Sequence, residues 1–142
     1  MNSRFALASS GASLRPRKPI RHALNPVPGN HSTPIIDHWV LQLRGVEPHR
    51  LDDPERLCGL LKGCAAALEL TCVSDHSHYF GPGVSTVLIL SESHLSVHTW
   101  PELGYLHVDI VTCVRKLTEE RLEAVFGEAF GPREVQTVQL EY

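Results

Sequence analysis

The fold is decided by residues 84–113, which read VSTVLILSESHLSVHTWPELGYLHVDIVTC. Pro101 and Gly104 interrupt this stretch, as the residues of a turn do. Short runs rich in β-branched and apolar residues, separated by such turns, are typical of antiparallel strands. We therefore predict three consecutive strands, at 84–92, 94–100 and 104–113.

Strand-like segments also lie on both sides of this stretch. Residues 36–46 alternate well enough between apolar and polar side chains for a strand. Residues 70–80 form another strand-like run, which Gly81-Pro82-Gly83 separates from the next one. Residues 134–142 are predicted to close the chain as a final strand.

Two helices are predicted from their end signals. Asp53-Pro54-Glu55 supplies an N-cap, a proline at the first helical position and an acid in the first turn, and apolar residues follow at helical spacing to about Leu68. Thr118 is an N-cap for a second helix that stops before Gly131-Pro132. The predicted order is β-α-β-β-β-β-α-β. The expected fold class is α+β, a two-layer sandwich of a mostly antiparallel sheet with both helices on one face.

The first 35 residues differ from the rest in composition and charge. They are rich in Ser, Pro, Arg and Asn and show no hydrophobic period, so we expect a disordered tail at 1–35 and one folded domain at 36–142. A start rich in Arg and Ser and free of acids also fits an organellar transit peptide or a nucleic-acid-binding arm. Residues 37–142 hold all 16 acids against 8 bases, and this acidic body argues against nucleic-acid binding.

The location and the redox state of the protein follow from what the composition lacks. No apolar run approaches the roughly 18 residues that cross a bilayer, and no secretory core is present, so we expect a cytoplasmic protein without a membrane partner. No C-x-x-C pair occurs, and we expect reduced thiols at four positions: Cys58, Cys64, Cys72 and Cys113. His76-x-His78 resembles a metal pair, but nothing completes a zinc site around it, so no metal is expected.

Polar residues are concentrated between Glu92 and Glu102. In an extended strand His94, Ser96 and His98 share one face, whereas Ser93 lies on the other, so a bend or bulge is needed to bring Ser93 and His98 together. These residues alone leave two interpretations open. They are either solvent-facing residues of a hairpin or a nucleophilic site built on a serine and a histidine.

The segment from Glu92 to Glu102, with Gly104-Tyr105 and Asp109 to Cys113 downstream, closely resembles the processing and active-site segment of bacterial S-adenosylmethionine decarboxylases. Gly83-Val84-Ser85 resembles an upstream segment of the same family. The resemblance is strongest over residues 76–113 and extends over 36–142. It implies a self-cleaving enzyme with a pyruvoyl cofactor.

The resemblance implies that the Ser93 side chain attacks the carbonyl of Glu92 and converts the peptide bond into an ester. Elimination and hydrolysis then leave chains of residues 1–92 and 93–142, the second headed by a pyruvoyl group made from Ser93. The substrate amine forms a Schiff base with this group, which acts as the electron sink for loss of carbon dioxide. The expected product is the aminopropyl donor for spermidine synthesis.

Supporting roles carry over from the same resemblance. His98 matches the histidine that removes a proton during elimination, and Ser85 matches a serine that assists processing through a hydrogen bond. Cys113 matches the cysteine that reprotonates the substrate carbon after decarboxylation.

For the substrate, Glu102 matches an acid expected to bind the ribose hydroxyls. Tyr79 and Phe80 are the candidates for stacking on adenine and attracting the sulfonium. Gln42 and Arg44 depart from the acidic or aromatic residues that relatives often carry on the first strand.

The resemblance leaves two alternative functions open and implies a second copy of the chain as partner. Relatives with the same cofactor act on arginine or ornithine, and a processing-dead paralogue would serve as a regulatory partner. Family members resemble half of a larger sandwich that pairs as a symmetric dimer, so we expect at least a dimer of cleaved protomers.

Overall fold

The computed structural model describes residues 34–142, and the expectations for a disordered tail, targeting signal or basic arm lie outside these residues. Two helices and six strands follow the predicted order, which confirms the α+β class. They are β1 (Asp37–Arg44), α1 (Pro54–Ala67), β2 (Cys72–Tyr79), β3 (Val84–Leu90), β4 (Ser93–Trp100), β5 (Tyr105–Thr112), α2 (Glu119–Phe130) and β6 (Glu134–Leu140). Short 3-10 turns lie at Pro48–Arg50 and Pro101–Leu103.

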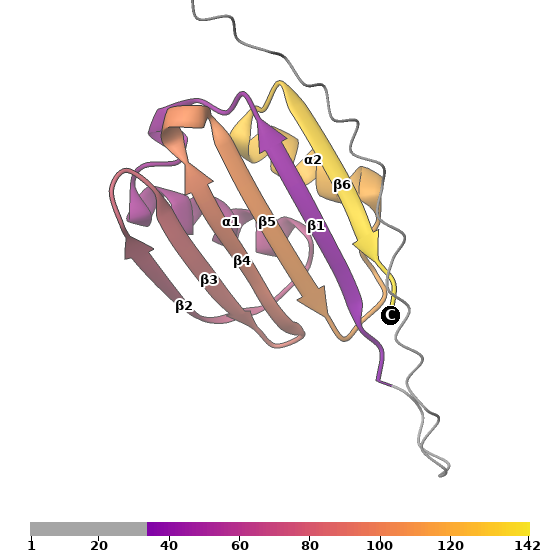
Figure 1. Cartoon of the computed structure of the whole chain (residues 1–142). Coiled ribbons are helices and arrows are strands. Elements are labelled where there is room, and N and C mark those ends of the chain that lie inside the picture. Colours follow the sequence, from indigo (N-terminus) through magenta and orange to yellow (C-terminus); the bar gives the residue numbers. More distant parts are fainter. Residues whose placement is uncertain (1–33) are drawn as a thin grey trace, which may run out of the picture. The chain divides into compact units, whose positions relative to one another are not determined.

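The six strands form one antiparallel sheet in the order β2-β3-β4-β5-β1-β6. Strands β2 to β5 form a meander, and β1 lies between β5 and β6, far from both in sequence. Both helices lie behind the sheet in Figure 1 and cover the same face of it. The structure is therefore the predicted two-layer sandwich, with one face of the sheet left uncovered by any element of residues 34–142.

The helix ends follow the predicted capping. The Asp53 carboxylate accepts a hydrogen bond from the backbone N–H of Arg56 at 2.7 Å, and the Thr118 hydroxyl accepts one from Arg121 at 3.3 Å. Helix α2 ends at Gly131, whose φ of 58° is the left-handed conformation that glycine adopts at little cost. Each cap satisfies backbone groups that the helix itself leaves unpaired.

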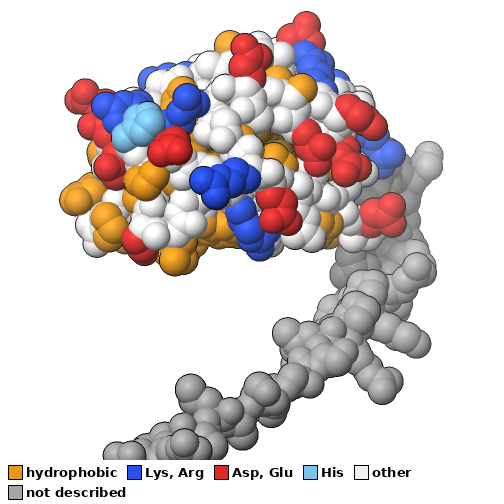
Figure 2. Space-filling model, turned by 90° about the horizontal axis from the view of Figure 1, so that it is seen from above, with side chains coloured by type: hydrophobic (Ala, Val, Ile, Leu, Met, Phe, Trp, Pro, Cys, Tyr) orange, Lys and Arg blue, Asp and Glu red, His pale blue; other side chains and the backbone are white. Residues whose placement is uncertain are grey.

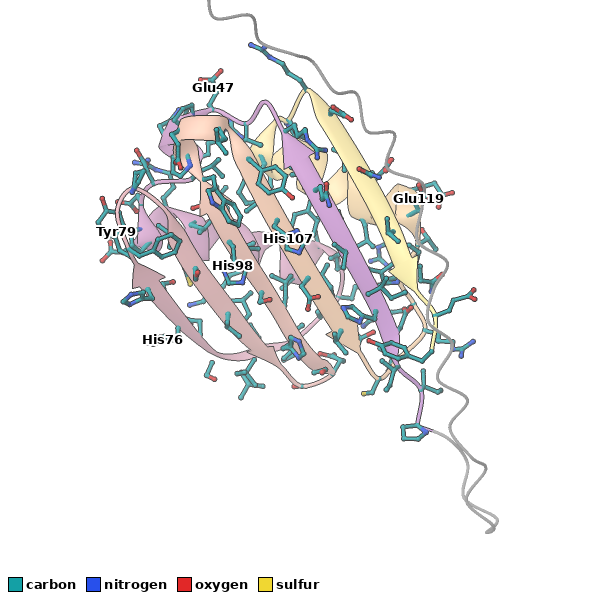
Figure 3. The ribbon with its side chains drawn as sticks, in the orientation of Figure 1. Glu47, His76, Tyr79, His98, His107 and Glu119 are labelled. Carbon is teal, nitrogen blue, oxygen red and sulfur yellow. The ribbon has the colours of Figure 1, made fainter. Side chains whose placement is uncertain are left out.

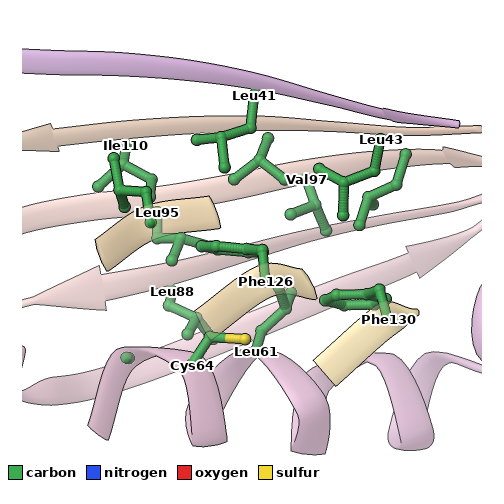
Figure 4. Packing of buried hydrophobic residues seen from close by; sticks show 14 of the residues in the cluster. Leu41, Leu43, Leu61, Cys64, Leu88, Leu95, Val97, Ile110, Phe126 and Phe130 are labelled. Atoms are coloured by element: carbon green, nitrogen blue, oxygen red, sulfur yellow. The ribbon is translucent and has the colours of Figure 1, made fainter. Parts of the chain in front are cut away.

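Alternation along the strands separates the core from the uncovered face. In β4, Leu95, Val97 and Thr99 are buried against the helices. Figure 4 shows the aromatic rings of Phe126 and Phe130 packed between the strands and α1. The opposite side chains form what we call the open face: His38, Val40, Gln42 and Arg44 of β1, Ser74, His76 and His78 of β2, Ser85, Val87 and Ile89 of β3, His94, Ser96, His98 and Trp100 of β4, Tyr105, His107, Asp109 and Val111 of β5, and Glu134, Gln136, Val138 and Leu140 of β6.

Neither helix of residues 34–142 has the length and apolarity needed to cross a membrane.

Figure 2 looks onto the end of the molecule that lies at the top of Figure 1. Acidic and basic side chains are interspersed over this end and do not separate into single-sign patches.

Candidate active site

The Glu92–Ser93 bond lies at a strained turn. Ser91 and Glu92 are the two turn residues between β3 and β4, and Leu90 pairs with Ser93 across the hairpin. Ser93 has a φ of 147°, a value that residues with a side chain rarely adopt. A backbone held in such a region costs on the order of 1–3 kcal/mol and persists only where the surrounding structure enforces it.

Hydrogen bonds from two other segments hold this turn in place. The backbone N–H of Ser91 donates to the carbonyl oxygen of Thr71 at 2.9 Å, and the N–H of Thr71 donates to the Glu92 carboxylate at 3.1 Å. On the other side, the backbone N–H of Cys113, just after β5, donates to the Glu92 carbonyl oxygen at 2.9 Å. The carbonyl that Ser93 is predicted to attack is therefore fixed and polarised by a backbone donor.

The Ser93 side chain contacts His94, a residue of the open face. The Ser93 hydroxyl is 3.3 Å from Nδ1 of His94, although strand alternation assigns these neighbours to opposite faces. The positive φ at Ser93 marks a local departure from regular strand geometry. Cys113 is exposed and follows Thr112, the residue that pairs with Ser93. Glu92, Ser93 and Cys113 thus meet at one end of the sheet, which we call the Ser93 end.

Ser85 and His98 form a second group farther along the strands. They are cross-strand partners of β3 and β4, and the Ser85 hydroxyl is 2.7 Å from Nδ1 of His98. His107 of β5 pairs with His98 on the other side, and Figure 3 shows the two rings on neighbouring strands. Ser85 and His98, for which the resemblance implies separate roles in processing, are therefore in direct side-chain contact.

The predicted substrate residues lie at this same end, which we call the His98 end. Tyr79 and Phe80 are half-exposed at the end of β2, and the Phe80 ring stacks on His78 with centroids 6.4 Å apart. Gly83 closes the adjoining turn, where a Cβ would lie 2.6 Å from the carbonyl oxygen of Thr99. Glu102 is exposed in the turn after β4. None of these residues approaches Ser93 of the same chain, because they lie at the opposite end of the sheet.

The two ends are separated along β4 itself. Ser93 and His98 are five residues apart in one extended strand, which at roughly 3.3 Å per residue places their Cα atoms about 16 Å apart. The bend at Ser93 turns its hydroxyl but does not bring it to His98 of the same chain. Within one chain, the predicted nucleophile and its predicted processing histidine do not meet.

Other polar side chains on the open face were not predicted as site residues. At the Ser93 end, Asp109 lies 2.7 Å from His38 and 3.6 Å from His94. At the His98 end, Trp100 packs on Tyr105 with ring centroids 5.4 Å apart, and the Arg44 guanidinium lies over the Tyr105 ring. Strand alternation alone places these residues on one face, but their contacts depend on the order of the strands. Among residues 34–142 no three His, Cys, Asp or Glu side chains gather as metal ligands would.

Comparisons with known proteins agree on one family. The sequence model of a family described as S-adenosylmethionine decarboxylase matches residues 37–141. The S-adenosylmethionine decarboxylase proenzyme of Methanococcus maripaludis is 44% identical over 105 residues, covering 73% of this chain and 86% of that protein. The proenzyme of the same name from Thermodesulfovibrio yellowstonii is 33% identical over 105 residues, covering 73% of this chain and 78% of that protein.

A solved structure adds a match of the fold. The crystal structure of the adenosylmethionine decarboxylase from Aquifex aeolicus superposes with a TM-score of 0.68 at 30% identity, covering 78% of this chain and 92% of that chain. The family match over residues 37–141 spans every described strand and both helices, including both ends of the open face. This chain belongs to the S-adenosylmethionine decarboxylase family.

Proposed function

We propose that this chain is a self-processing S-adenosylmethionine decarboxylase that cleaves its own Glu92–Ser93 bond and carries a pyruvoyl group made from Ser93. The observation that carries the proposal is the geometry of this bond. Its carbonyl accepts a hydrogen bond from the Cys113 N–H at 2.9 Å, and the serine that follows has a φ of 147°. An ordinary hairpin turn needs neither feature.

The first step is an acyl shift within the chain. The Ser93 hydroxyl oxygen bonds to the carbonyl carbon of Glu92, the C–N bond breaks, and the hydroxyl proton passes to the released nitrogen. Negative charge develops on the Glu92 carbonyl oxygen during the attack, and the Cys113 N–H is already aimed at that atom. Strain at Ser93 favours the shift because it raises the energy of the peptide form but is relieved when the bond opens.

The second step is elimination of the ester. A base removes the Cα proton of residue 93, the ester oxygen leaves with the carboxyl group of Glu92, and hydrolysis of the resulting enamine releases ammonia. His98 suits this role because a neutral imidazole can act as a general base and its Nδ1 is held by Ser85. Residues 1–92 and 93–142 then form the two chains of the mature protomer.

In the mature enzyme the pyruvoyl carbonyl supplies the electron sink that decarboxylation requires. Cys113 is the proposed proton donor to the substrate carbon. Its thiol is exposed at the Ser93 end, and its own backbone is already bonded to residue 92. The product is the aminopropyl donor for spermidine synthesis.

The separation of Ser93 from His98 leads us to propose a face-to-face dimer. If a second copy packs on the open face about a two-fold axis that crosses β4 near Ser96, its His98 end lies over the Ser93 end of the first chain. Each chain then supplies the nucleophile of one site and the histidine of the other, as an isologous interface allows. Packed sheets lie about 10 Å apart, a separation that facing side chains can bridge.

The open face has the composition of an interface. Three apolar side chains are close to half exposed on it: Ile89 at 47%, Val138 at 44% and Leu140 at 40%. They lie on β3 and β6, on both sides of the histidines in the middle of the sheet. Apolar exposure spread over a six-stranded sheet is stabilised by a second layer.

The same dimer gives the substrate-binding residues a place. Tyr79, Phe80 and Glu102 lie at the His98 end, so in the proposed dimer they reach the pyruvoyl group of the partner. Arg44, stacked over Tyr105, lies at that end too. The relatives compared above are named for S-adenosylmethionine, and nothing in the comparisons favours arginine or ornithine.

Mass spectrometry of the purified chain tests the proposal. The wild-type chain is expected to yield fragments ending at Glu92 and beginning at residue 93, the second with the mass of a pyruvoyl group. Ser93→Ala is expected to remain one intact chain, whereas Ser96→Ala, on the same strand, is expected to cleave. An uncleaved wild-type chain that stays intact on incubation would contradict self-processing. Release of labelled carbon dioxide from S-adenosylmethionine, but not from arginine or ornithine, identifies the substrate.

A further inference from the structure

A chain of polar contacts continues from Ser93 across the open face. The Ser93 hydroxyl lies 3.3 Å from Nδ1 of His94, and Nε2 of His94 lies 3.6 Å from one oxygen of Asp109. The other Asp109 oxygen lies 2.7 Å from Nε2 of His38. Nδ1 of His38 in turn lies 2.5 Å from the hydroxyl of Tyr142. Three strands, β4, β5 and β1, therefore contribute side chains to one network that begins at the reactive serine.

The contacts admit one consistent arrangement of protons with both imidazoles neutral. Tyr142 donates its hydroxyl proton to Nδ1 of His38, and Nε2–H of His38 donates to Asp109. On the other side, Nε2 of His94 lies 3.6 Å from Asp109, beyond hydrogen-bond range, and the carboxylate there electrostatically favours a proton on Nε2, the tautomer in which Nδ1 of His94 accepts from the Ser93 hydroxyl. A carboxylate thus selects the tautomer that exposes a basic nitrogen to the nucleophile, which is the logic of a serine–histidine–aspartate arrangement.

We propose that His94, oriented by Asp109, is the base that takes the Ser93 proton when the ester at Glu92 forms, a step distinct from the elimination assigned to His98. This inference rests on the proposed self-processing. Nδ1 of His94 accepts the proton as the Ser93 oxygen bonds to the Glu92 carbonyl carbon. The protonated imidazole returns it to the nitrogen of residue 93 as the C–N bond breaks. No other reactant is needed, and Asp109 stabilises the imidazolium between the two transfers.

Geometry favours His94 over His98 for this first step. His94 contacts the Ser93 hydroxyl within the same chain, whereas His98 of that chain lies about 16 Å away along β4. The division assigns ester formation to the folded protomer and elimination to the assembled dimer. His38 acts on the reaction only through Asp109 and is a positioning residue.

Hydroxylamine at neutral pH separates the two steps, because it cleaves esters and leaves ordinary peptide bonds intact. The variants to compare are His94→Asn, Asp109→Asn and His98→Ala, with His76→Asn as the matched control on the same face. In His94→Asn the amide can still accept a hydrogen bond from Ser93 but cannot take its proton. Each purified chain is incubated with and without hydroxylamine, and cut and intact chains are quantified on a denaturing gel.

The His94→Asn chain is expected to self-cleave about 10²-fold more slowly than wild type and to resist hydroxylamine, because no ester forms. Asp109→Asn is expected to slow cleavage about 10-fold with the same resistance. The His98→Ala chain is expected to stay intact until hydroxylamine cuts it at residue 93. A chain that does not fold would also resist hydroxylamine, so each variant is first shown to have a cooperative urea unfolding transition, and if His94→Asn fails to fold, Asp109→Asn decides.

Two results would overturn the inference while leaving self-processing intact. In the first, the wild-type chain cleaves and His94→Asn cleaves at the same rate. In the second, hydroxylamine cuts His94→Asn as readily as His98→Ala. Failure of the wild-type chain to cleave at Glu92–Ser93 contradicts instead the proposed function.

Discussion

The two ends of β4 differ in what they contribute to the site. At the Ser93 end the backbone is strained, and hydrogen bonds from Thr71 and Cys113 hold the Glu92–Ser93 bond in place. At the His98 end the backbone is regular, and the notable feature is a side-chain pair, Ser85 with His98. In the proposed function, one end holds the bond to be broken, and the other holds the base for its elimination. In the proposed dimer, neither end is a complete site without a second copy.

Replacement of His98, the proposed base, is the strongest test of the difference between the two ends. His98→Ala is expected to slow release of the 93–142 fragment by up to about 10⁴-fold, the upper range for loss of a general base. Ser85→Ala, which removes only the partner at 2.7 Å, is expected to slow it about 10-fold. Time courses on denaturing gels measure both, with His76→Ala as the control. Cleavage of His98→Ala at the wild-type rate would remove His98 from the account.

The thiol of the Ser93 end is expected to react quite differently from a thiol of the core. Burial raises the pKa of Cys64 from 9.0 to about 12, so its thiolate fraction near pH 8 is about a thousandfold below that of an ordinary thiol. Cys113 is exposed. Iodoacetamide at pH 8 is expected to modify Cys113 and spare Cys64, as peptide mass spectrometry would reveal. Equal modification of the two would contradict the packing described here.

The same shift predicts a loss of stability in alkali. Above pH 9 the Cys64 thiol ionises in the unfolded chain before it does so in the folded one, so the free energy of unfolding falls as the pH rises from 9 toward 12. Cys64→Ala removes this component of the decline, which urea unfolding at pH 8 and pH 10 measures.

A charge on the open face is expected to weaken the proposed dimer, in which the Ser93 end of one copy meets the His98 end of the other. Ile89→Asp places two carboxylates in the proposed symmetric interface and removes two apolar contacts, which costs about 3 kcal/mol or more and raises the dimer Kd about a hundredfold. Sedimentation and cleavage should decline together. Ala66→Asp adds the same charge on the exposed side of α1 and is the control. Loss of dimer with unchanged cleavage would separate assembly from processing.

The smallest effect is expected from a substitution in the helix layer, away from both ends of β4. Asp53→Ala removes the side chain that caps α1 and should lower the free energy of unfolding by about 1 kcal/mol. Urea unfolding in the Ser93→Ala background, where every chain is intact, measures this value. The cleavage rate at Glu92–Ser93 should be unchanged in the otherwise wild-type chain, and a slower rate would mean that the helix layer affects the turn.

Much of the fold was predictable because its signals are local. The caps at Asp53 and Thr118 act within three residues, and alternation in β4 directly reports which side chains are buried. The insertion of β1 between β5 and β6 was not predicted, because it depends on pairing between segments far apart in sequence. The network at Ser93 escaped prediction for the same reason, since His38 meets Asp109 only through that pairing.

The candidate site shows a different limit of prediction from sequence. The resemblance to the family is carried by the sequence alone, and it indicates Ser93, His98, Ser85 and Cys113 as candidates. Strand parity adds that a bend is needed near Ser93. Parity describes which face a side chain takes but not how far along the strand it lies. The separation of Ser93 and His98 could therefore be derived only from the structure, in which both residues lie in one continuous strand, β4.

Complementation between two inactive chains tests the central claim most directly, namely that each site is shared by two copies. The Ser93→Ala and His98→Ala chains are co-expressed with different tags, and mixed dimers are isolated through both. The account predicts that the His98→Ala chain, alone uncleaved, is cut at Glu92–Ser93 in the mixed dimer while the Ser93→Ala chain stays intact. Mixed dimers in which both chains remain uncut would contradict it.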